Sequence, residues 1–258
     1  MLWVLLALKR ACRMLIDTHC HIDQFPNPEA IVVECEAADV KVVAVTNHPE
    51  HYEMALPHLA NSERVFPALG FHPLNATTNP TELRIFERFA KEAKYIGEIG
   101  LDFSKAGLPT RRQQEELFNH LLGLLQKTSS FITLHSRGAE KEVLEALQIH
   151  KISRACFHWY SGAIDTLEEI LSEGHFVSIN TSMLMTQKGQ KILDVVPLGQ
   201  LLAESDGPYA KLNRKPCKPT GVIEVYQAIS RKLRLELDEV KYILKRNFER
   251  ASKHKMMD

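Results

Sequence analysis

The sequence has few cysteines, and their spacing indicates no cross-linked framework. Among its 258 residues there are five, an odd number, and no two of them form a C-x-x-C pair: Cys12, Cys20, Cys35, Cys156 and Cys217. This pattern excludes a disulfide scaffold of the kind that holds small secreted domains together. We therefore expect reduced thiols in a cytoplasmic protein.

The sequence also lacks net charge and low-complexity segments. Its 32 basic and 32 acidic side chains cancel, so any affinity for nucleic acid must come from a local patch of charge. At 45% hydrophobic and 25% charged residues, the composition is typical of a globular protein. Because no linker is evident after residue 14, we expect one domain over residues 14–258.

No apolar run is long enough to cross a membrane. The longest candidate, residues 2–8, is too short for a bilayer span. It is also a poor signal peptide, because positive charges follow it and no small-residue cleavage site is evident. We expect residues 1–13 to be a disordered N-terminal extension or a mis-called start before Met14. The alternative is a segment that binds a partner or touches a membrane.

What the sequence does have is a series of short β-rich runs at a fairly regular interval. In order they are MLIDTH, VKVVAVTN, RVFPALGFH, YIGEIGLD, FITLHS, ACFHWY, HFVSIN and LLAESD. Each run finishes near a polar residue: His19, Asn47, His72, Glu98, His135, His158, Asn180 and Asp206. Mostly apolar strands of this kind are typical of a parallel sheet buried on both faces.

Segments with helical periodicity lie between these runs, for example residues 110–127 and 138–148. Strand–helix alternation indicates parallel strands joined by crossover helices, and eight such units favour a closed ring over an open sheet. The fold class expected is therefore α/β, a TIM-type (β/α)8 barrel. Residues 219–234 and 238–251 add two helices at the C-terminus.

The polar strand ends predict a metal centre. In a TIM barrel the carboxyl ends of the strands converge on one face, which carries the active site. His19 and His21 are two apart and should point to the same side, while Cys20 points away. Four imidazoles and two carboxylates gathered there suit one or two divalent ions. These six side chains are His19, His21, Glu98, His135, His158 and Asp206.

Each of these residues alone has a plainer explanation. A strand histidine is more often part of a core or surface than a ligand, and Asp206 in ESDGP can simply start a turn. Glu98, between two glycines, can cap the following loop. Their occurrence together at five strand ends favours the metal site.

At these residues the sequence resembles the TatD family of metal-dependent deoxyribonucleases, from about Met14 to about Ala251. The motifs that carry the resemblance are DTHCHID (17–23), GFHP (70–73), GEIGLD (97–102), LHSR (134–137), FHWYSG (157–162) and ESDGP (204–208). Within the family the chain is most similar to the TatD-type subunit of Qat anti-phage defence operons. That similarity implies antiviral defence and other subunits of the operon as partners.

The resemblance implies metal roles for all six ligand residues and a cofactor of two divalent ions, Mg²⁺, Mn²⁺ or Zn²⁺. Glu98 would bridge the ions, and His19 and His21 would share one ion with it. The other ion would be held by His135 and His158. Asp206 would ligate a metal and accept a proton from the attacking water.

Other residues are expected around this centre. Asp23 and Glu204 are predicted to orient ligands from behind. His72, Arg137, Lys211 and Arg214 are predicted to bind substrate phosphate, although Arg137 could form a rim salt bridge instead and the basic loop could be merely solvated. Trp159 and Tyr160 could stack a base, but packing is the commoner role for such aromatics.

The function expected is exonucleolytic hydrolysis of DNA by a water activated between two metals. One alternative is a metal-dependent amide or ester hydrolase, such as a deacetylase or an aminoacyl-tRNA deacylase. Against it, those relatives often carry a bridging lysine where this chain has Glu98. The other alternative is a non-catalytic interaction subunit of a defence complex.

Overall fold

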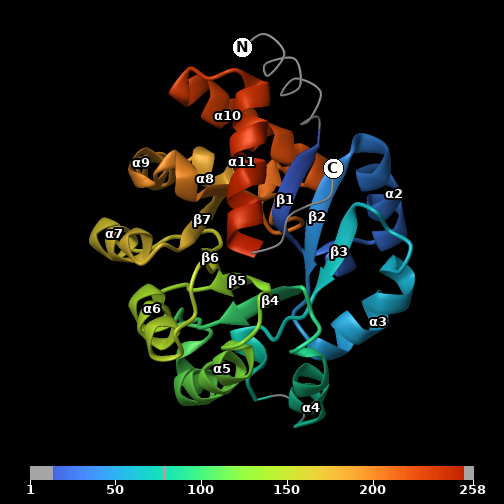
Figure 1. Ribbon diagram of the computed structural model, residues 1–258, viewed down its shortest axis with the longest axis vertical. Helices are drawn as coiled ribbons and strands as arrows, with labels where there is room; N and C mark the ends of the chain where they lie inside the picture. Colours follow the sequence, from blue (N-terminus) through green and yellow to red (C-terminus); the bar gives the residue numbers. More distant parts are fainter. Residues whose placement is uncertain (1–13, 78–79, 253–258) are drawn as a thin grey trace.

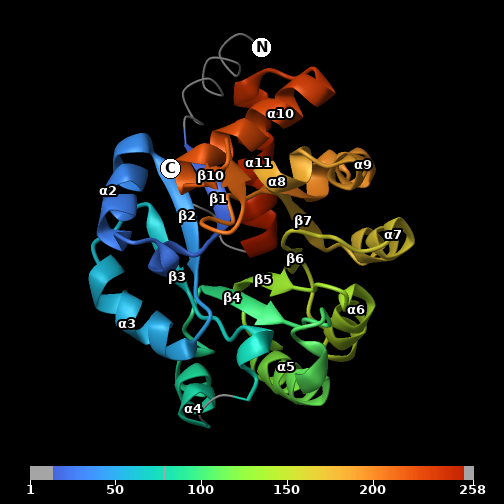
Figure 2. The same cartoon turned by 180° about the vertical axis from the view of Figure 1, so that it is seen from behind.

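The protein is seen in a computed structural model that describes residues 14–77 and 80–252. The expectations for residues 1–13 lie outside these ranges. The chain winds through eight parallel strands with helices around them (Figure 1; Figure 2 gives the opposite view). None of the helices within the described ranges is long and apolar enough to cross a membrane.

The strands match the eight runs predicted from the sequence, and only the first strand extends beyond its run, by one residue. They are β1 Leu15–Cys20, β2 Val40–Val45, β3 Val65–Ala68, β4 Tyr95–Gly100, β5 Phe131–His135, β6 Cys156–Phe157, β7 Phe176–Ile179 and β8 Leu201–Ala203. Strands β1, β2 and β3 form one parallel sheet, and β4 to β8 form a second in sequence order. A short antiparallel pair, β9 Lys211–Leu212 and β10 Lys215–Pro216, follows β8.

Helices connect successive strands and cover the outside of the sheets. They are α2 Pro28–Ala38, α3 Pro49–Leu59, α4 Pro80–Phe89, α5 Arg111–Leu125, α6 Glu140–Ile149, α7 Ile164–Ser172, α8 Thr181–Leu184 and α9 Gln187–Val195. The two C-terminal helices expected from periodicity are also present, as α10 Ile223–Leu233 and α11 Leu237–Ser252. Short 3-10 turns are η1 Ile22–Gln24, η2 Pro73–Asn75, η3 Leu108–Thr110, η4 Leu198–Gln200 and η5 Pro219–Val222.

Backbone contacts outside the eight strands join the two sheets at two places, between β3 and β4 and between β8 and β1. Leu69 bridges to Ile96 in parallel, which links the β3 and β4 sides. On the other side, the Asp206 backbone N–H donates to the His19 carbonyl at 2.9 Å, and the His21 N–H donates to Gly207 at 2.8 Å. The arrangement is consistent with the predicted TIM-type barrel, and the α/β fold is confirmed.

The ring encloses an apolar core that α11 closes at one end. Buried residues from seven strands, with Tyr95 of β4 packed against them, meet Phe248 and Ala251 of α11. The Phe248 ring lies 5.0 Å from that of Phe131, measured between centroids, where β5 begins. Because α11 covers the end where the strands start, the opposite end is the one open to a ligand.

Candidate metal centre

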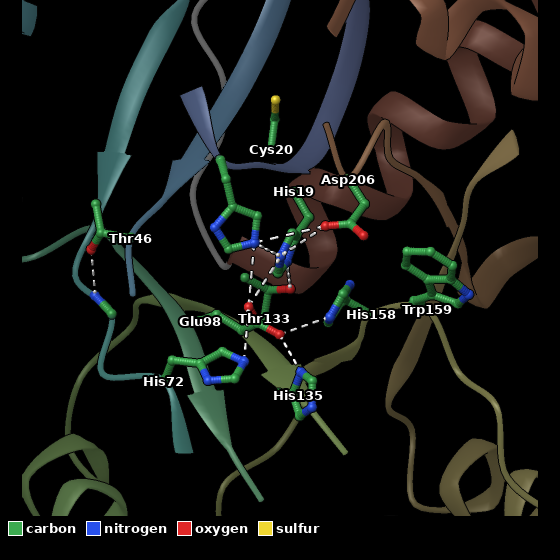
Figure 3. Close-up of polar contacts among 12 residues, drawn as sticks. His19, Cys20, Thr46, His72, Glu98, Thr133, His135, His158, Trp159 and Asp206 are labelled. Atoms are coloured by element: carbon green, nitrogen blue, oxygen red, sulfur yellow. Dashed lines mark hydrogen bonds and ion pairs between the residues drawn. The ribbon is translucent and has the colours of Figure 1, made fainter. Parts of the chain in front are cut away.

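The six predicted ligand residues converge at the carboxyl ends of the strands. His19 lies near the end of β1, Glu98 within β4, and His135 at the last position of β5. His21 and His158 follow directly after β1 and β6, and Asp206 lies three residues beyond β8, so the ring of strand ends delivers all six to one place (Figure 3). Cys20 points away from the cluster, as expected, and its thiol is buried in the outer core.

One set of ligand atoms surrounds a common point between β1 and β8. The Nε2 atoms of His19 and His21 lie 3.3 Å apart. Oε2 of Glu98 is 3.8 Å from the first and 3.3 Å from the second. Oδ1 of Asp206 is 3.8 Å and 3.7 Å from the same two nitrogens. One oxygen of each carboxylate therefore faces the same pair of imidazole nitrogens.

A second set uses the other oxygen of Glu98. Its Oε1 is 2.5 Å from Nδ1 of His135 and 2.8 Å from Nε2 of His158. The imidazoles of His19 and His158 stack with centroids 3.8 Å apart, which places the two sets side by side. The Glu98 carboxylate thus separates them, with one oxygen directed at each.

Burial gives this cluster unusual electrostatics. Burial alone would raise the pKa of Glu98, but the imidazoles of His158, His72 and His135 outweigh it and hold that pKa well below its usual range. The pKa of Asp206 is well above its ordinary value, mainly because of burial, with the carboxylates of Glu204 and Glu98 adding to the effect. Two carboxyl groups a few ångströms apart therefore differ strongly in acidity.

The donor set fits divalent cations. Oδ1 of Asp206, one of these ligand atoms, is buried and has no hydrogen-bond partner among the described residues. Ligand atoms of His19, His21 and Glu98 all lie within 4.8 Å of one another, as do those of His72, Glu98 and His135. Nitrogen and oxygen donors packed this closely would be costly to bury without a cation between them.

Neighbouring side chains hold the ligands in place. Thr133 Oγ1 lies 2.9 Å from Nδ1 of His19, which directs Nε2 into the cluster. Glu204, which we predicted to orient a ligand, lies 3.5 Å from Nδ1 of His158, within ion-pair distance. Its carboxylate is anchored in turn, because it accepts hydrogen bonds from Ser178 and from the Asn180 amide.

Asp102 plays a similar part that sequence reasoning missed. Its Oδ2 lies 2.8 Å from Nε2 of His135, and its Oδ1 accepts a hydrogen bond from the Ser104 N–H. Burial would raise the pKa of Asp102, but the hydrogen bonds from His135 and Ser104 outweigh it and lower that pKa. In the sequence, Asp102 is the aspartate that ends the GEIGLD motif.

Replacing Asp102 with asparagine is expected to weaken metal binding by about 10- to 100-fold, the usual cost of losing such a supporting carboxylate. The amide can no longer act as an anionic acceptor for His135, so the ring loses its preferred orientation. Calorimetric titration of Mn²⁺ into metal-stripped protein measures the effect. Asp194→Asn, which changes an exposed partner of Lys232, is the matched control. Equal affinities in the two variants would contradict the role.

The prediction for Asp23 is corrected. Its carboxylate lies near the surface, where Oδ2 is 2.9 Å from Nδ1 of His51 and also accepts from the Gln24 amide at 2.8 Å. Asp23 contacts none of the metal-ligand candidates, because the η1 turn carries it away from His21. It therefore does not orient a ligand.

The cluster forms the floor of a cavity of about 780 Å³. His72 and Arg137, two of the predicted phosphate contacts, line it. Nε2 of His72 is 3.8 Å from Glu98 Oε2, and burial lowers the pKa of His72 to about 4. The alternative for Arg137, a salt bridge on the barrel rim, is not formed within the described residues. Lys211 and Arg214 are exposed on the β9–β10 hairpin and are not among the cavity-lining residues.

Aromatic side chains divide between core and cavity. Tyr160 is 1% exposed and donates its hydroxyl proton to the Ala163 carbonyl at 2.6 Å, so it is a packing residue. Trp159 lines the cavity, and so does Tyr209, which sequence reasoning did not single out. The Tyr209 ring meets His21 edge-on, with centroids 5.0 Å apart.

A parallel α/β ring with imidazoles and carboxylates at its strand ends defines a metal-dependent hydrolase. The chain belongs to the family of TatD related DNases, whose model matches residues 16–253. It is therefore a metal-dependent hydrolase of the class that acts on ester bonds.

Individual relatives agree with this assignment. An uncharacterized metal-dependent hydrolase of Methanocaldococcus jannaschii, MJ1582, is 27% identical, with 90% of this chain and 94% of the relative covered. The 3'-5' ssDNA/RNA exonuclease TatD of Enterobacter lignolyticus is 30% identical, with 70% and 73% covered. The crystal structure of the TatD homologue YjjV from Escherichia coli superposes with a TM-score of 0.81 at 25% identity, over 91% of this chain and 96% of that one.

Proposed function

We propose that this protein removes nucleotides from the end of a DNA strand by hydrolysing phosphodiester bonds at two divalent metal ions. The observation that carries the proposal is the position of Glu98, whose two oxygens face separate sets of ligand atoms. A carboxylate in that position can be shared by two cations. Two ions about 3.5–4 Å apart would stabilise both the attacking and the leaving oxygen of an in-line displacement at phosphorus.

The four histidine ligands form two pairs, one for each proposed metal site. His19 and His21 face one oxygen of Glu98, and His135 and His158 face the other. Imidazole-rich sites suit Zn²⁺ or Mn²⁺ by softness, and Mg²⁺ is the third candidate. Because the ligands come from strands spread between β1 and β8, we treat residues 14–258 as one catalytic domain.

Asp206 is the proposed proton acceptor. Its Oδ1 lies at the edge of the first set with no hydrogen-bond partner among the described residues, so it is available to the attacking water. A carboxylate positioned beside the attacking water can take its proton as a general base. Glu98, by contrast, stays ionised, which suits a shared ligand.

His72 is placed to donate a hydrogen bond to a substrate phosphate. Its Nδ1 accepts the Leu74 N–H at 3.2 Å, so the proton of the neutral ring sits on Nε2, which is directed at the cluster. Arg137 can add a guanidinium fork from the cavity wall. Lys211 and Arg214 on the hairpin can attract the more distant backbone phosphates.

A role in anti-phage defence with partner subunits is also proposed, supported by the sequence resemblance to Qat operon subunits. Its test is phage plating on cells that carry the operon, comparing the wild-type chain with Asp206→Asn. Equal protection by both would contradict a catalytic role in defence.

Nuclease activity on end-labelled single-stranded DNA tests the central proposal. Metal-stripped protein receives Mg²⁺, Mn²⁺ or Zn²⁺, and acetylated amines and aminoacyl esters are assayed on the same preparation. We expect metal-restored shortening of DNA from one end, and the product ladder identifies that end. Turnover of the acyl substrates with no cleavage of DNA by metal-loaded protein would instead assign an amide or ester hydrolase.

A further inference from the structure

The cavity above the metal-ligand cluster has an aromatic wall that metal chemistry does not require. Tyr209 is 51% exposed, the most exposed aromatic side chain among the described residues, yet it lines this cavity. It follows Asp206 by three residues, and its ring is edge-on to His21. Half of its surface is exposed at the cavity, where a ligand seated at the cluster could contact it. Burial raises the pKa of the Tyr209 hydroxyl, so this residue stays neutral in the working pH range.

Trp159 provides a second aromatic surface, next to the other set of ligands. It follows His158, lines the same cavity, and is only partly buried against the core. Its φ of 39° lies in the left-handed region, which a bulky residue rarely adopts. The backbone N–H is held there by a 3.1 Å hydrogen bond to Glu204 Oε1. Figure 3 shows the indole next to His158.

The rings of Tyr209 and Trp159 suit the nucleobases of a nucleic-acid substrate, which the metal ligands do not contact. A phosphodiester is bound through charge and hydrogen bonds, which the cluster, His72 and Arg137 supply. Flat apolar rings in an otherwise polar cavity suit instead the flat face of a nucleobase. Strain kept at a cavity-lining residue such as Trp159 is commonly retained for function.

We propose that Tyr209 and Trp159 stack the bases of the two nucleotides that flank the scissile phosphate. Tyr209 lies beside the ligand set of His21, and Trp159 beside that of His158, so one ring serves each side of the bond. The inference rests on the proposed phosphodiesterase function and adds a base-binding subsite to it. It requires both bases to be unpaired and accessible at the moment of cleavage.

A comparison of natural and abasic substrates tests the subsite. The substrates are single-stranded oligonucleotides of one length, with either natural bases or abasic residues at the two terminal positions of the attacked end. Stacking on protein aromatics changes binding by about 5- to 150-fold per base, so wild-type protein should prefer the natural substrate by at least the lower figure in kcat/KM. Tyr209→Ala and Trp159→Ala should each reduce that preference.

Two further variants make the result specific. Tyr209→Phe keeps the ring and should keep the preference, because the hydroxyl is not needed for stacking. Tyr242→Ala removes another exposed tyrosine, on α11 away from the cavity, and should leave both rates unchanged. Equal rates of wild-type protein on natural and abasic strands would overturn the subsite while leaving the phosphodiesterase function intact. Failure to cleave either strand with metal present would overturn both.

Discussion

The variant Asp206→Asn is expected to lower kcat on a DNA substrate by about 10²- to 10⁴-fold, the usual contribution of a positioned proton acceptor. An amide cannot take a proton from water at neutral pH. Its side chain nonetheless has the shape of the carboxylate and keeps one oxygen to direct at His19 and His21. Three other ligand atoms of that set, from His19, His21 and Glu98, remain in place. We therefore expect metal still to bind when the ion is supplied in excess.

The measurement combines single-turnover cleavage with metal analysis of the same sample. Asp23→Asn is the matched control, because it makes the same chemical change at a carboxylate that lies outside the cluster. That control should stay within about twofold of wild type, as most surface substitutions change free energies by no more than ~0.5 kcal/mol. A variant at Asp206 that retained full turnover would remove this residue from the reaction.

The fold was predictable because a parallel barrel repeats one simple pattern. Each strand is buried on both faces, so it reads as a short apolar run that ends on a polar residue. Each of the eight predicted runs contains a strand. In the shortest, β6, only Cys156–Phe157 pair with neighbouring strands. The sequence could not indicate how the ring is completed, because the β8–β1 and β3–β4 junctions depend on hydrogen bonds beyond the strands, such as that from Asp206 to His19.

The ligand cluster was predictable for the same topological reason, since parallel strands deliver their carboxyl ends to one face. The positions of residues on the loops after the strands could not be predicted in this way. Asp23 is two residues from His21 in sequence, yet a single turn carries it to His51. Asp102 and Tyr209 enter the site through loop conformations that periodicity does not encode. Thr133 is in a strand, but its contact with His19 depends on packing across the ring.

The variant Glu98→Gln is expected to reduce metal binding as well as turnover, because it disturbs both sets of ligands at once. A carboxylate offers an oxygen to each set, whereas a carboxamide offers one oxygen and one NH₂ group. The NH₂ donor would then face either His19 and His21 or His135 and His158 in place of an acceptor. The two proposed metal sites would no longer share an anion.

We expect kcat/KM for DNA to fall by about 10³-fold or more, since a catalytic metal supplies several kcal/mol and each 1.36 kcal/mol is a factor of ten. Metal content should also fall, from two ions per chain to one or none, as measured by mass spectrometry of dialysed protein. Glu63→Gln, whose side chain is 80% exposed, is the matched control and should keep both values. The two site variants then separate two roles. Loss of turnover with metal retained identifies the proton acceptor, and loss of both identifies the shared ligand. If Glu98→Gln still bound two ions as tightly as wild type, its carboxylate would not be the bridge, and the two ligand sets would have to act independently.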